Sequence, residues 1–244
     1  KGLEGLVKAR GITTVHGAGQ LQQDRSVAVG DDVYVGTDVI LATGSYSRTL
    51  PGLEIGGRIL TSEQALALDE VPERVIILGG GVIGVEFASV WRSFGVEVTV
   101  VEALPHLVPN EDIAMSKGLE RAFRRRGISS SLGTRFQSAT QDESSVTVTL
   151  ENGTTFTADY LLVAVGRGPV TADLGFEAAG VTLDRGFVVV DDDLRTRAPG
   201  VWAVGDIVPG LQLAHRSFQQ GIAVAERIAG LSPAAVPETQ IPKV

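Results

Sequence analysis

Cysteine is absent from the 244-residue chain, so no disulfide can brace the fold and no thiol of this chain can take part in chemistry. This composition is compatible with the cytoplasm, where we expect the protein to be. Basic side chains are also in deficit, with 21 Lys and Arg against 29 Asp and Glu, a formal net charge of −8. We therefore expect neither nucleic acid nor an anionic membrane surface as a partner. No apolar run approaches the roughly 20 residues of a membrane span, and no signal-peptide pattern opens the sequence.

Aromatic residues are scarce at 5%, whereas glycine is abundant, with 30 residues. Abundant glycine and valine suit buried parallel strands joined to helices by tight turns. The apolar patterns predict a strand over 74–78, a helix over 81–95, a strand over 96–102 and a helix over 111–127. Alternation of this kind predicts an α/β fold with a parallel sheet covered by helices. In the first of these helices, the spacing predicts one buried face formed by Ile83, Phe87, Val90, Trp91 and Phe94.

Between the first of these strands and its helix, Gly79, Gly81 and Gly84 form the pattern G-x-G-x-x-G, with Val82 and Ile83 between the last two glycines. In a dinucleotide-binding turn, the first glycine permits the tight turn, the second admits the pyrophosphate and the third lets the helix pack closely on the sheet. Free N–H groups and the helix dipole then favour the phosphates. The alternative is a glycine-rich turn that binds nothing.

Glu102 closes the next strand, 23 positions after Gly79, where an acidic residue can bind the hydroxyls of the adenosine ribose. A 2′-phosphate about 4 Å from that carboxylate would be repelled by roughly 4 kcal/mol per unit charge at an effective dielectric of 20. Half of this repulsion still favours NAD over NADP by more than about tenfold. If the turn binds nothing, Glu102 is merely a solvated side chain.

Two segments, 39–53 and 161–175, resemble each other, since each is a buried strand ending in Ala-Thr-Gly or Ala-Val-Gly, then a polar turn and a proline. The second segment completes the unit that opens at residue 75. The strand in 201–208 is not needed by that unit, so we expect it to return to the earlier half. The sequence thus predicts a complete NAD-binding domain over 61–170, inserted into the remnant of another nucleotide-binding domain over 1–60, with residues 171–244 returning to that remnant or to a central region.

The succession of LATGS, GGGVIGVEF, VVEALPHLVPNED, AVGRGP and VWAVGDI with LAHRSFQQG resembles the flavin-dependent disulfide oxidoreductases across essentially the whole chain. Within that family it is most similar to the dihydrolipoamide dehydrogenases. The resemblance implies a Rossmann-like, three-layer FAD/NAD(P)-binding fold with a complete NAD domain inserted in a partial FAD domain. It also implies electron transfer from dihydrolipoyl groups through FAD to NAD.

The resemblance assigns NAD contacts to Gly79, Gly81, Gly84 and Glu102, and places Glu86 near the nicotinamide. The alternative for Glu86 is an exposed charge on the helix without a binding role. Gly166 and Arg167 resemble the glycine-arginine pair that borders the NAD site. The family usually continues with Pro-Asn, whereas this chain has Pro169 and Val170, so no contact is assigned beyond Arg167.

The FAD contacts that the resemblance implies come from three places in the chain. One is a strand-end motif, another a Gly-Asp pair that binds ribityl or phosphate oxygens, and the third a helix start facing the pyrimidine edge of the flavin. In this sequence they are Thr43 and Gly44, Gly205 and Asp206, and Leu213, Ala214 and His215.

Other elements that the resemblance implies are not found in this sequence. They are a Cys-x4-Cys redox pair, a His-Glu base pair, the first βαβ unit of the FAD domain and a dimerisation domain. We therefore expect a truncated form that binds NAD(H), retains FAD poorly and is inactive alone, while the intact parent would meet a dihydrolipoyl domain and a homodimer partner. The alternatives are a portion of a mercuric, mycothiol or glutathione-type reductase, and a standalone NAD-binding or interaction module without redox activity.

Overall fold

The computed structural model describes residues 2–235 and 237–243, and it divides the chain into two compact units. One is continuous, residues 46–168, and is called the central unit here; the other consists of residues 1–45 and 169–244 and is called the split unit. The chain passes between them along β5 (Ser45–Ser47) and β14 (Arg167–Pro169), which pair as a two-stranded sheet. The central unit therefore begins at residue 46, 15 residues before the predicted start of the NAD-binding domain at 61.

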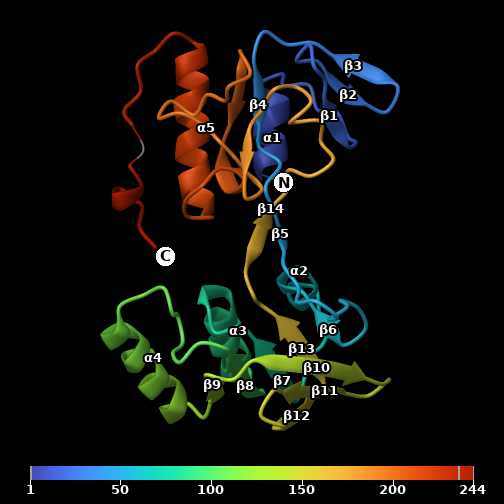
Figure 1. Ribbon diagram of the computed structural model, residues 1–244, viewed down its shortest axis with the longest axis vertical. Helices are drawn as coiled ribbons and strands as arrows, with labels where there is room; N and C mark the ends of the chain where they lie inside the picture. Colours follow the sequence, from blue (N-terminus) through green and yellow to red (C-terminus); the bar gives the residue numbers. More distant parts are fainter. Residues whose placement is uncertain (1, 236, 244) are drawn as a thin grey trace. The chain divides into compact units, whose positions relative to one another are not determined.

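The central unit is built on a five-stranded parallel sheet in the order β6-β13-β7-β8-β9 (Figure 1). Its strands are β6 (Ile59–Leu60), β7 (Arg74–Leu78), β8 (Glu97–Glu102), β9 (Ser129–Leu132) and β13 (Tyr160–Val163). Its helices are α2 (Ser62–Leu66), α3 (Val82–Ser93) and α4 (Ile113–Arg125). An antiparallel sheet of β10 (Phe136–Gln141), β11 (Val146–Leu150) and β12 (Thr155–Ala158) completes the unit.

Alternate side chains of β7 enter two different cores, as the period of a strand requires. Val75 and Ile77 pack with the buried residues of α3 and α4, whereas Ile76 and Leu78 pack with β11. The parallel sheet is thus covered by helices on one face and by the antiparallel sheet on the other. This three-layer α/β arrangement confirms the predicted fold class.

The predicted buried face of α3 is correct for Trp91, which is buried, and for Phe87, which packs against the core, but it is wrong for Val90 and Phe94. Gly84, Val85, Ala88 and Trp91 are its buried residues, whereas the side chains of Val90 and Phe94 are 51% and 65% exposed. The reason is that small residues let this helix lie close to the sheet, so the face that packs is set by Gly84 and Ala88 rather than by the bulkiest side chains.

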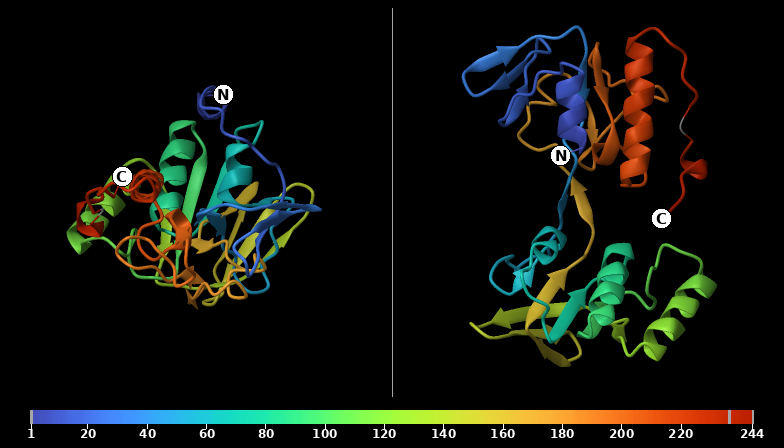
Figure 2. Two further views of the ribbon diagram at one scale, coloured as in Figure 1. Left: turned by 90° about the horizontal axis from the view of Figure 1, so that it is seen from above. Right: turned by 180° about the vertical axis from the view of Figure 1, so that it is seen from behind.

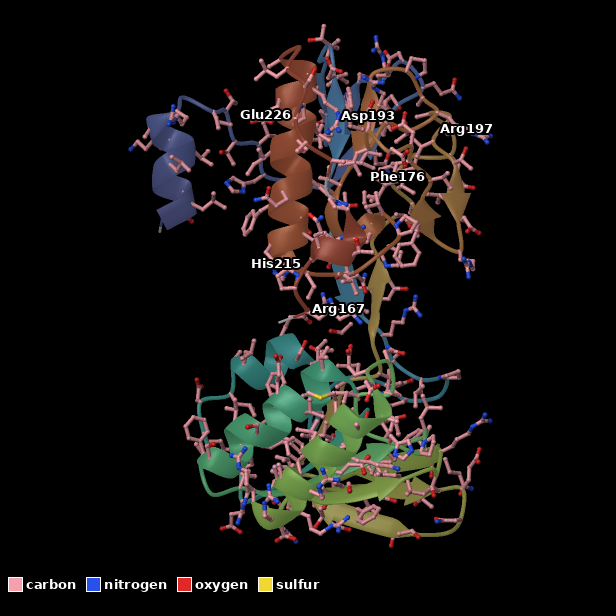
Figure 3. The ribbon with its side chains drawn as sticks, turned by 90° about the vertical axis from the view of Figure 1, so that its left-hand side faces the viewer. Arg167, Phe176, Asp193, Arg197, His215 and Glu226 are labelled. Atoms are coloured by element: carbon pink, nitrogen blue, oxygen red, sulfur yellow. The ribbon has the colours of Figure 1, made fainter. Side chains whose placement is uncertain are left out.

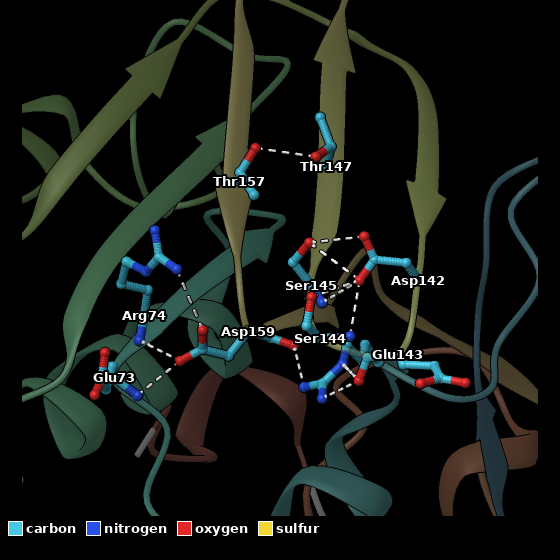
Figure 4. A network of polar contacts seen from close by, with 10 residues as sticks. Glu73, Arg74, Asp142, Glu143, Ser144, Ser145, Thr147, Thr157 and Asp159 are labelled. Atoms are coloured by element: carbon cyan, nitrogen blue, oxygen red, sulfur yellow. Dashed lines mark hydrogen bonds and ion pairs between the residues drawn. The ribbon is translucent and has the colours of Figure 1, made fainter.

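Polar contacts fasten the ends of β7 and β13 that lie opposite the glycine turn (Figure 4). The Asp159 carboxylate accepts hydrogen bonds from the backbone N–H groups of Glu73 at 2.8 Å and Arg74 at 2.9 Å. In the β10–β11 turn, the backbone and hydroxyl of Ser144 donate to Asp142, and these hydrogen bonds hold the pKa of Asp142 below its usual value. The polar groups at this end of the unit therefore hold the strands and the β10–β11 turn in place.

The split unit contains α1 (Gly2–Ala9), α5 (Ala214–Ile228) and two short 3₁₀ turns, η1 (Gly205–Ile207) and η2 (Glu238–Gln240). Its strands are β1 (Gly19–Leu21), β2 (Val27–Val29), β3 (Asp32–Tyr34), β4 (Val39–Leu41), β15 (Leu183–Asp184), β16 (Phe187–Val188) and β17 (Val201–Ala203). The predicted antiparallel meander is present as β1-β2-β3.

The strand β4 leaves this meander and pairs in parallel with β17, with Leu41 opposite Ala203. The expectation that the strand in 201–208 returns to the earlier half is thereby confirmed. Helix α5 lies beside this pair of strands (Figure 2). It packs there through Val224, which belongs to one buried cluster with Trp202 and Val204. Within the described ranges, none of the helices has the length and apolar character needed to cross a membrane.

Candidate functional site

The carboxyl ends of β7, β8 and β13 meet at one edge of the parallel sheet. Leu78, the last residue of β7, pairs with Val101 on one side and with Val163 on the other. The chain therefore leaves β7 between β8 and β13, whose ends lie beside the end of β7. Helix α3 leads from β7 to β8 on one face of the sheet, whereas the chain reaches β13 from the antiparallel sheet on the other face. In open α/β sheets, such a switch point is where ligands bind.

Packing within the protein requires glycine at positions 79 and 84, the first and third glycines of the G-x-G-x-x-G pattern. A Cβ atom at Gly79 would lie 2.3 Å from the carbonyl oxygen of Ala164, and Gly79 has a φ of +112°. A Cβ atom at Gly84 would lie 1.9 Å from the carbonyl oxygen of Gly79. These glycines thus allow the turn to pass β13 and allow α3 to press on the turn.

Gly81 differs from both because, apart from Gly81 itself and the adjoining backbone, no atom of the described residues lies within 4 Å of the place where its Cβ would be. Its φ of −72° and ψ of −176° are extended values that other residues adopt readily. Gly81 is also the N-cap of α3, and among the described residues no side chain caps this end of the helix. Val82 is exposed and Ile83 half-buried in the first turn. The uncapped N–H groups and the open space at Gly81 form a cradle that fits a phosphate group.

Glu102 lies beside this cradle and is held by the backbone. Its carboxylate accepts one hydrogen bond from the N–H of Gly80 at 2.7 Å and another from the N–H of Leu104 at 2.8 Å. The sequence indicated the acid and the turn separately, whereas the structure joins them through Gly80. A carboxylate retains further lone pairs when each oxygen accepts one N–H, so Glu102 can still accept hydroxyl groups of a ribose.

The remaining predicted NAD residues lie in the same unit. Gly166 is exposed, has a φ of +111° and accepts a hydrogen bond from the N–H of Arg48. The guanidinium of Arg167 lies 3.2 Å from both the hydroxyl of Ser47 and the carboxylate of Glu63. Sequence reasoning missed Glu63, which is an exposed residue on a short helix and carries no motif. Glu86 is an exposed residue on α3.

In the split unit, the ends of β4 and β17 bring two of the predicted FAD motifs together. Val204 N–H donates to the Leu41 carbonyl, so the residues after both strands start from one level. The hydroxyl of Ser45 donates to the Asp206 carboxylate at 2.5 Å. Thr43 and Gly44 both bond Val170, through its carbonyl and its N–H respectively. The Thr-Gly and Gly-Asp motifs therefore lie at one edge.

The third predicted motif begins α5, with Leu213 as its N-cap, Ala214 as its first residue and His215 following (Figure 3). The Nε2 atom of the His215 ring lies 2.9 Å from the Pro242 carbonyl oxygen. Gly205 is buried against this helix, with a φ of +78° and its N–H bonded to Gln220 at 2.8 Å.

Two residues that support the Gly-Asp turn escaped sequence reasoning. Gln220 and Arg216 are buried, and the Arg216 guanidinium donates to the carbonyl of Gly205 at 3.4 Å. A signal was present, since polar residues at positions 216 and 220 are four apart and share a helix face with Ala223 and Val224. Polar side chains on the buried face of a helix indicate a buried network.

Comparison with known proteins agrees with this arrangement. Residues 1–221 match the model of the pyridine nucleotide-disulphide oxidoreductase family, and the chain belongs to that family. Among curated proteins, it is 40% identical to the dihydrolipoyl dehydrogenase of Cupriavidus necator over 96% of this chain and 51% of that protein. It is 36% identical to the dihydrolipoyl dehydrogenase of Bacillus subtilis over 92% of this chain and 49% of that protein. The chain thus spans about half the length of the curated relatives it matches.

Solved structures of flavoprotein disulfide reductases resemble the chain as well. The LpdA protein of Mycobacterium tuberculosis matches with a TM-score of 0.89 at 31% identity, over 97% of this chain and 54% of that one. The HOCl-induced flavoprotein disulfide reductase RclA of Escherichia coli matches with a TM-score of 0.87 at 30% identity, over 96% of this chain and 55% of that one. The similarity to dihydrolipoyl dehydrogenases predicted from the motifs is confirmed.

The different roles of the glycines give a prediction for stability. Gly84→Ala should lower the free energy of unfolding of the central unit by about 2–3 kcal/mol, because the added carbon collides with backbone and the helix must shift. Gly81→Ala, its matched control, should change that free energy by less than about 1 kcal/mol, the scale of an N-cap change. Urea unfolding followed by circular dichroism measures both, and equal losses would contradict the assignment.

Proposed function

We propose that this chain is the nucleotide-binding portion of an NAD-dependent oxidoreductase of the dihydrolipoyl dehydrogenase type. The observation that carries the proposal is the open space at Gly81, at the uncapped start of α3. Gly79 and Gly84 are needed by the fold itself, whereas the lack of a side chain at Gly81 serves no contact of the described chain. A pyrophosphate supplies the missing reason.

In this proposal the NAD pyrophosphate lies against the turn over 79–84, with Val82 and Ile83 supplying N–H groups. Glu102 binds the hydroxyls of the adenosine ribose and repels a 2′-phosphate. Glu86, Gly166 and Arg167 lie toward the nicotinamide, as the family resemblance implies. The residues present fit NAD because the donors, the space and the acid occur together at one switch point of the sheet.

The split unit fits one side of a flavin site. Thr43 and Gly44, Gly205 and Asp206, and the α5 start at Leu213, Ala214 and His215 would bind FAD, with Asp206 accepting from its hydroxyl groups. When bound, FAD carries an electron pair between a dithiol and NAD. Dihydrolipoyl groups and a second copy of the parent protein are the proposed partners, and the overall reaction converts a dithiol and NAD⁺ to a disulfide, NADH and a proton.

Two other functions are less well supported. A mercuric, mycothiol or glutathione-type reductase shares this architecture, but Glu102 disfavours those members that use NADPH. A standalone NAD-binding module would need only the central unit, whereas the split unit also carries the strand-end motifs at β4 and β17. The dehydrogenase proposal uses both sets of residues.

Replacing Gly81 tests the proposal directly. In Gly81→Val, NADH binding should weaken by more than about 100-fold, because charge-assisted N–H contacts worth about 1.5–3 kcal/mol each become blocked. The fold should persist, since valine accepts the extended backbone at this position. Fluorescence titration with NADH and circular dichroism measure the two properties.

Gly5→Val is the matched control, because Gly5 also has nothing within 4 Å of its missing Cβ but lies on α1 in the other unit. It should bind NADH as tightly as the unsubstituted chain does. If Gly81→Val folds and still binds NADH as tightly as the unsubstituted chain, the G-x-G-x-x-G segment is only a turn.

Cofactor preference depends on the charge at Glu102. The parent should bind NADH at least about tenfold more tightly than NADPH, because the carboxylate repels a 2′-phosphate. Glu102→Arg should move that affinity ratio toward NADPH. Glu97→Arg, the same exchange at the other end of β8, should leave the ratio unchanged. If a fluorescence titration gives equal affinities of the unsubstituted chain for NADH and NADPH, the assignment of Glu102 to the ribose-binding site is wrong.

Redox activity depends on thiols that this sequence lacks. The purified polypeptide should not oxidise dihydrolipoamide, because electron transfer from a dithiol needs a cysteine pair and the sequence contains no cysteine. We also expect a colourless preparation that still binds NADH. A spectrophotometric assay of NADH formation, with added FAD and with the C. necator relative as positive control, measures this. Turnover without a second polypeptide would contradict the proposal.

A further inference from the structure

The loop over residues 103–108 is the first part of the connection between β8 and α4, and it contacts the glycine turn directly. Val108 N–H donates to the Gly80 carbonyl at 2.7 Å. Gly80 is therefore held from both sides, since its own N–H donates to Glu102 at 2.7 Å. Leu104 N–H, in the same loop, donates to the other oxygen of Glu102. Movement of this loop would disturb both the turn and the ribose-binding acid.

This loop does not adopt its conformation through local preference alone. Val108 has a φ of +44°, in the left-handed region that β-branched residues avoid. Residues kept in such regions persist only where surrounding contacts determine them. The contacts that hold the loop therefore decide whether Gly80 and Glu102 keep their geometry.

Helix α4 supplies one such contact through Glu120. Its Oε1 atom accepts the N–H of Leu107 at 3.1 Å, and its side chain is 16% exposed. Leu107 is fully buried and lies against the turn, where a Cβ on Gly80 would approach its side chain to 2.7 Å. The Nδ1 atom of His106 lies 3.4 Å from the same Glu120 oxygen. Glu120 thus anchors the middle of the loop, 18 residues along the chain from Glu102.

We propose that Glu120 is a positioning residue for the adenosine end of the NAD site, acting through Leu107 and the loop over 103–108 on Gly80 and Glu102. This inference rests on the proposed function and extends it to a residue that touches no part of the nucleotide. What matters is the acceptor oxygen, because Leu107 N–H is buried and needs a partner. Glutamine keeps that oxygen and removes the charge, whereas alanine removes both.

The test compares three variants with the unsubstituted chain in NADH and NADPH titrations. Glu120→Ala should bind NADH about tenfold more weakly than the parent, equivalent to about 1.4 kcal/mol. Its preference for NADH over NADPH should narrow, since Glu102 is no longer fixed. Glu120→Gln should stay within about twofold of the parent, because the Leu107 N–H keeps a neutral acceptor. Glu97→Ala, which removes an exposed glutamate from β8, is the charge control and should bind as the parent does.

Amide hydrogen exchange without ligand supplies a second measurement. The N–H groups of Leu107 and Val108 should exchange faster in Glu120→Ala and at the parental rate in Glu120→Gln. Should the alanine variant fail to fold, Glu120→Asp, which shortens the side chain by one methylene, carries the same expectations as the alanine variant.

The outcomes separate the two proposals. A parent protein that binds no NADH overturns both the proposed function and this inference. Tight NADH binding by the parent together with unchanged affinity in folded Glu120→Ala or Glu120→Asp overturns the positioning role alone. Equal weakening in Glu120→Gln and Glu120→Ala would show that the charge of Glu120 matters rather than the hydrogen bond to Leu107, which also overturns the inference.

Discussion

The close approach of α3 to the end of β7 is the constraint on which the candidate site depends. Gly84 lies so near the Gly79 carbonyl that a Cβ atom at Gly84 would be 1.9 Å from that oxygen. This contact fixes where the first turn of the helix lies on the sheet. The uncapped N–H groups of that turn are thereby aimed at the space beside Gly81, instead of at another part of the protein.

Electrostatics and hydrogen bonding act together around Gly80. Its peptide donates to Glu102 and accepts from Val108, so one turn residue joins the end of β8 to the loop that follows it. Two backbone N–H groups thus hold the Glu102 carboxylate in place beside the turn. In the proposed function, this acid discriminates between ribose hydroxyls and a 2′-phosphate.

The two units solve one structural problem in similar ways. In each, parallel strands end at a common edge, a glycine with positive φ follows, and a helix begins nearby; Gly79 before α3 and Gly205 near α5 are the examples. The structures that support the two glycines differ. Gly79 packs on the backbone of Ala164, just after β13, whereas the N–H of Gly205 donates to the buried amide of Gln220. In the sequence, a contact with backbone atoms is marked only by the glycine itself. The hydrogen bond to Gly205 is marked by Gln220, a polar residue on the buried face of a helix.

The local pattern of residues was enough to predict the fold class, the order of β7, α3 and β8, the glycine turn and the return of the strand in 201–208 to the earlier half of the chain. These features follow from hydrophobic periodicity and from the few residue types that allow tight turns, both of which are read over short stretches. The prediction for the buried face of α3 was wrong at Val90 and Phe94, because side-chain size does not reveal how closely a backbone approaches. The link from Glu102 to Gly80 and the anchoring of Leu107 by Glu120 joined residues 22 and 13 positions apart. Only the tertiary structure decided these contacts. They depend on how separate elements pack against one another, and residue spacing within a single element does not determine them.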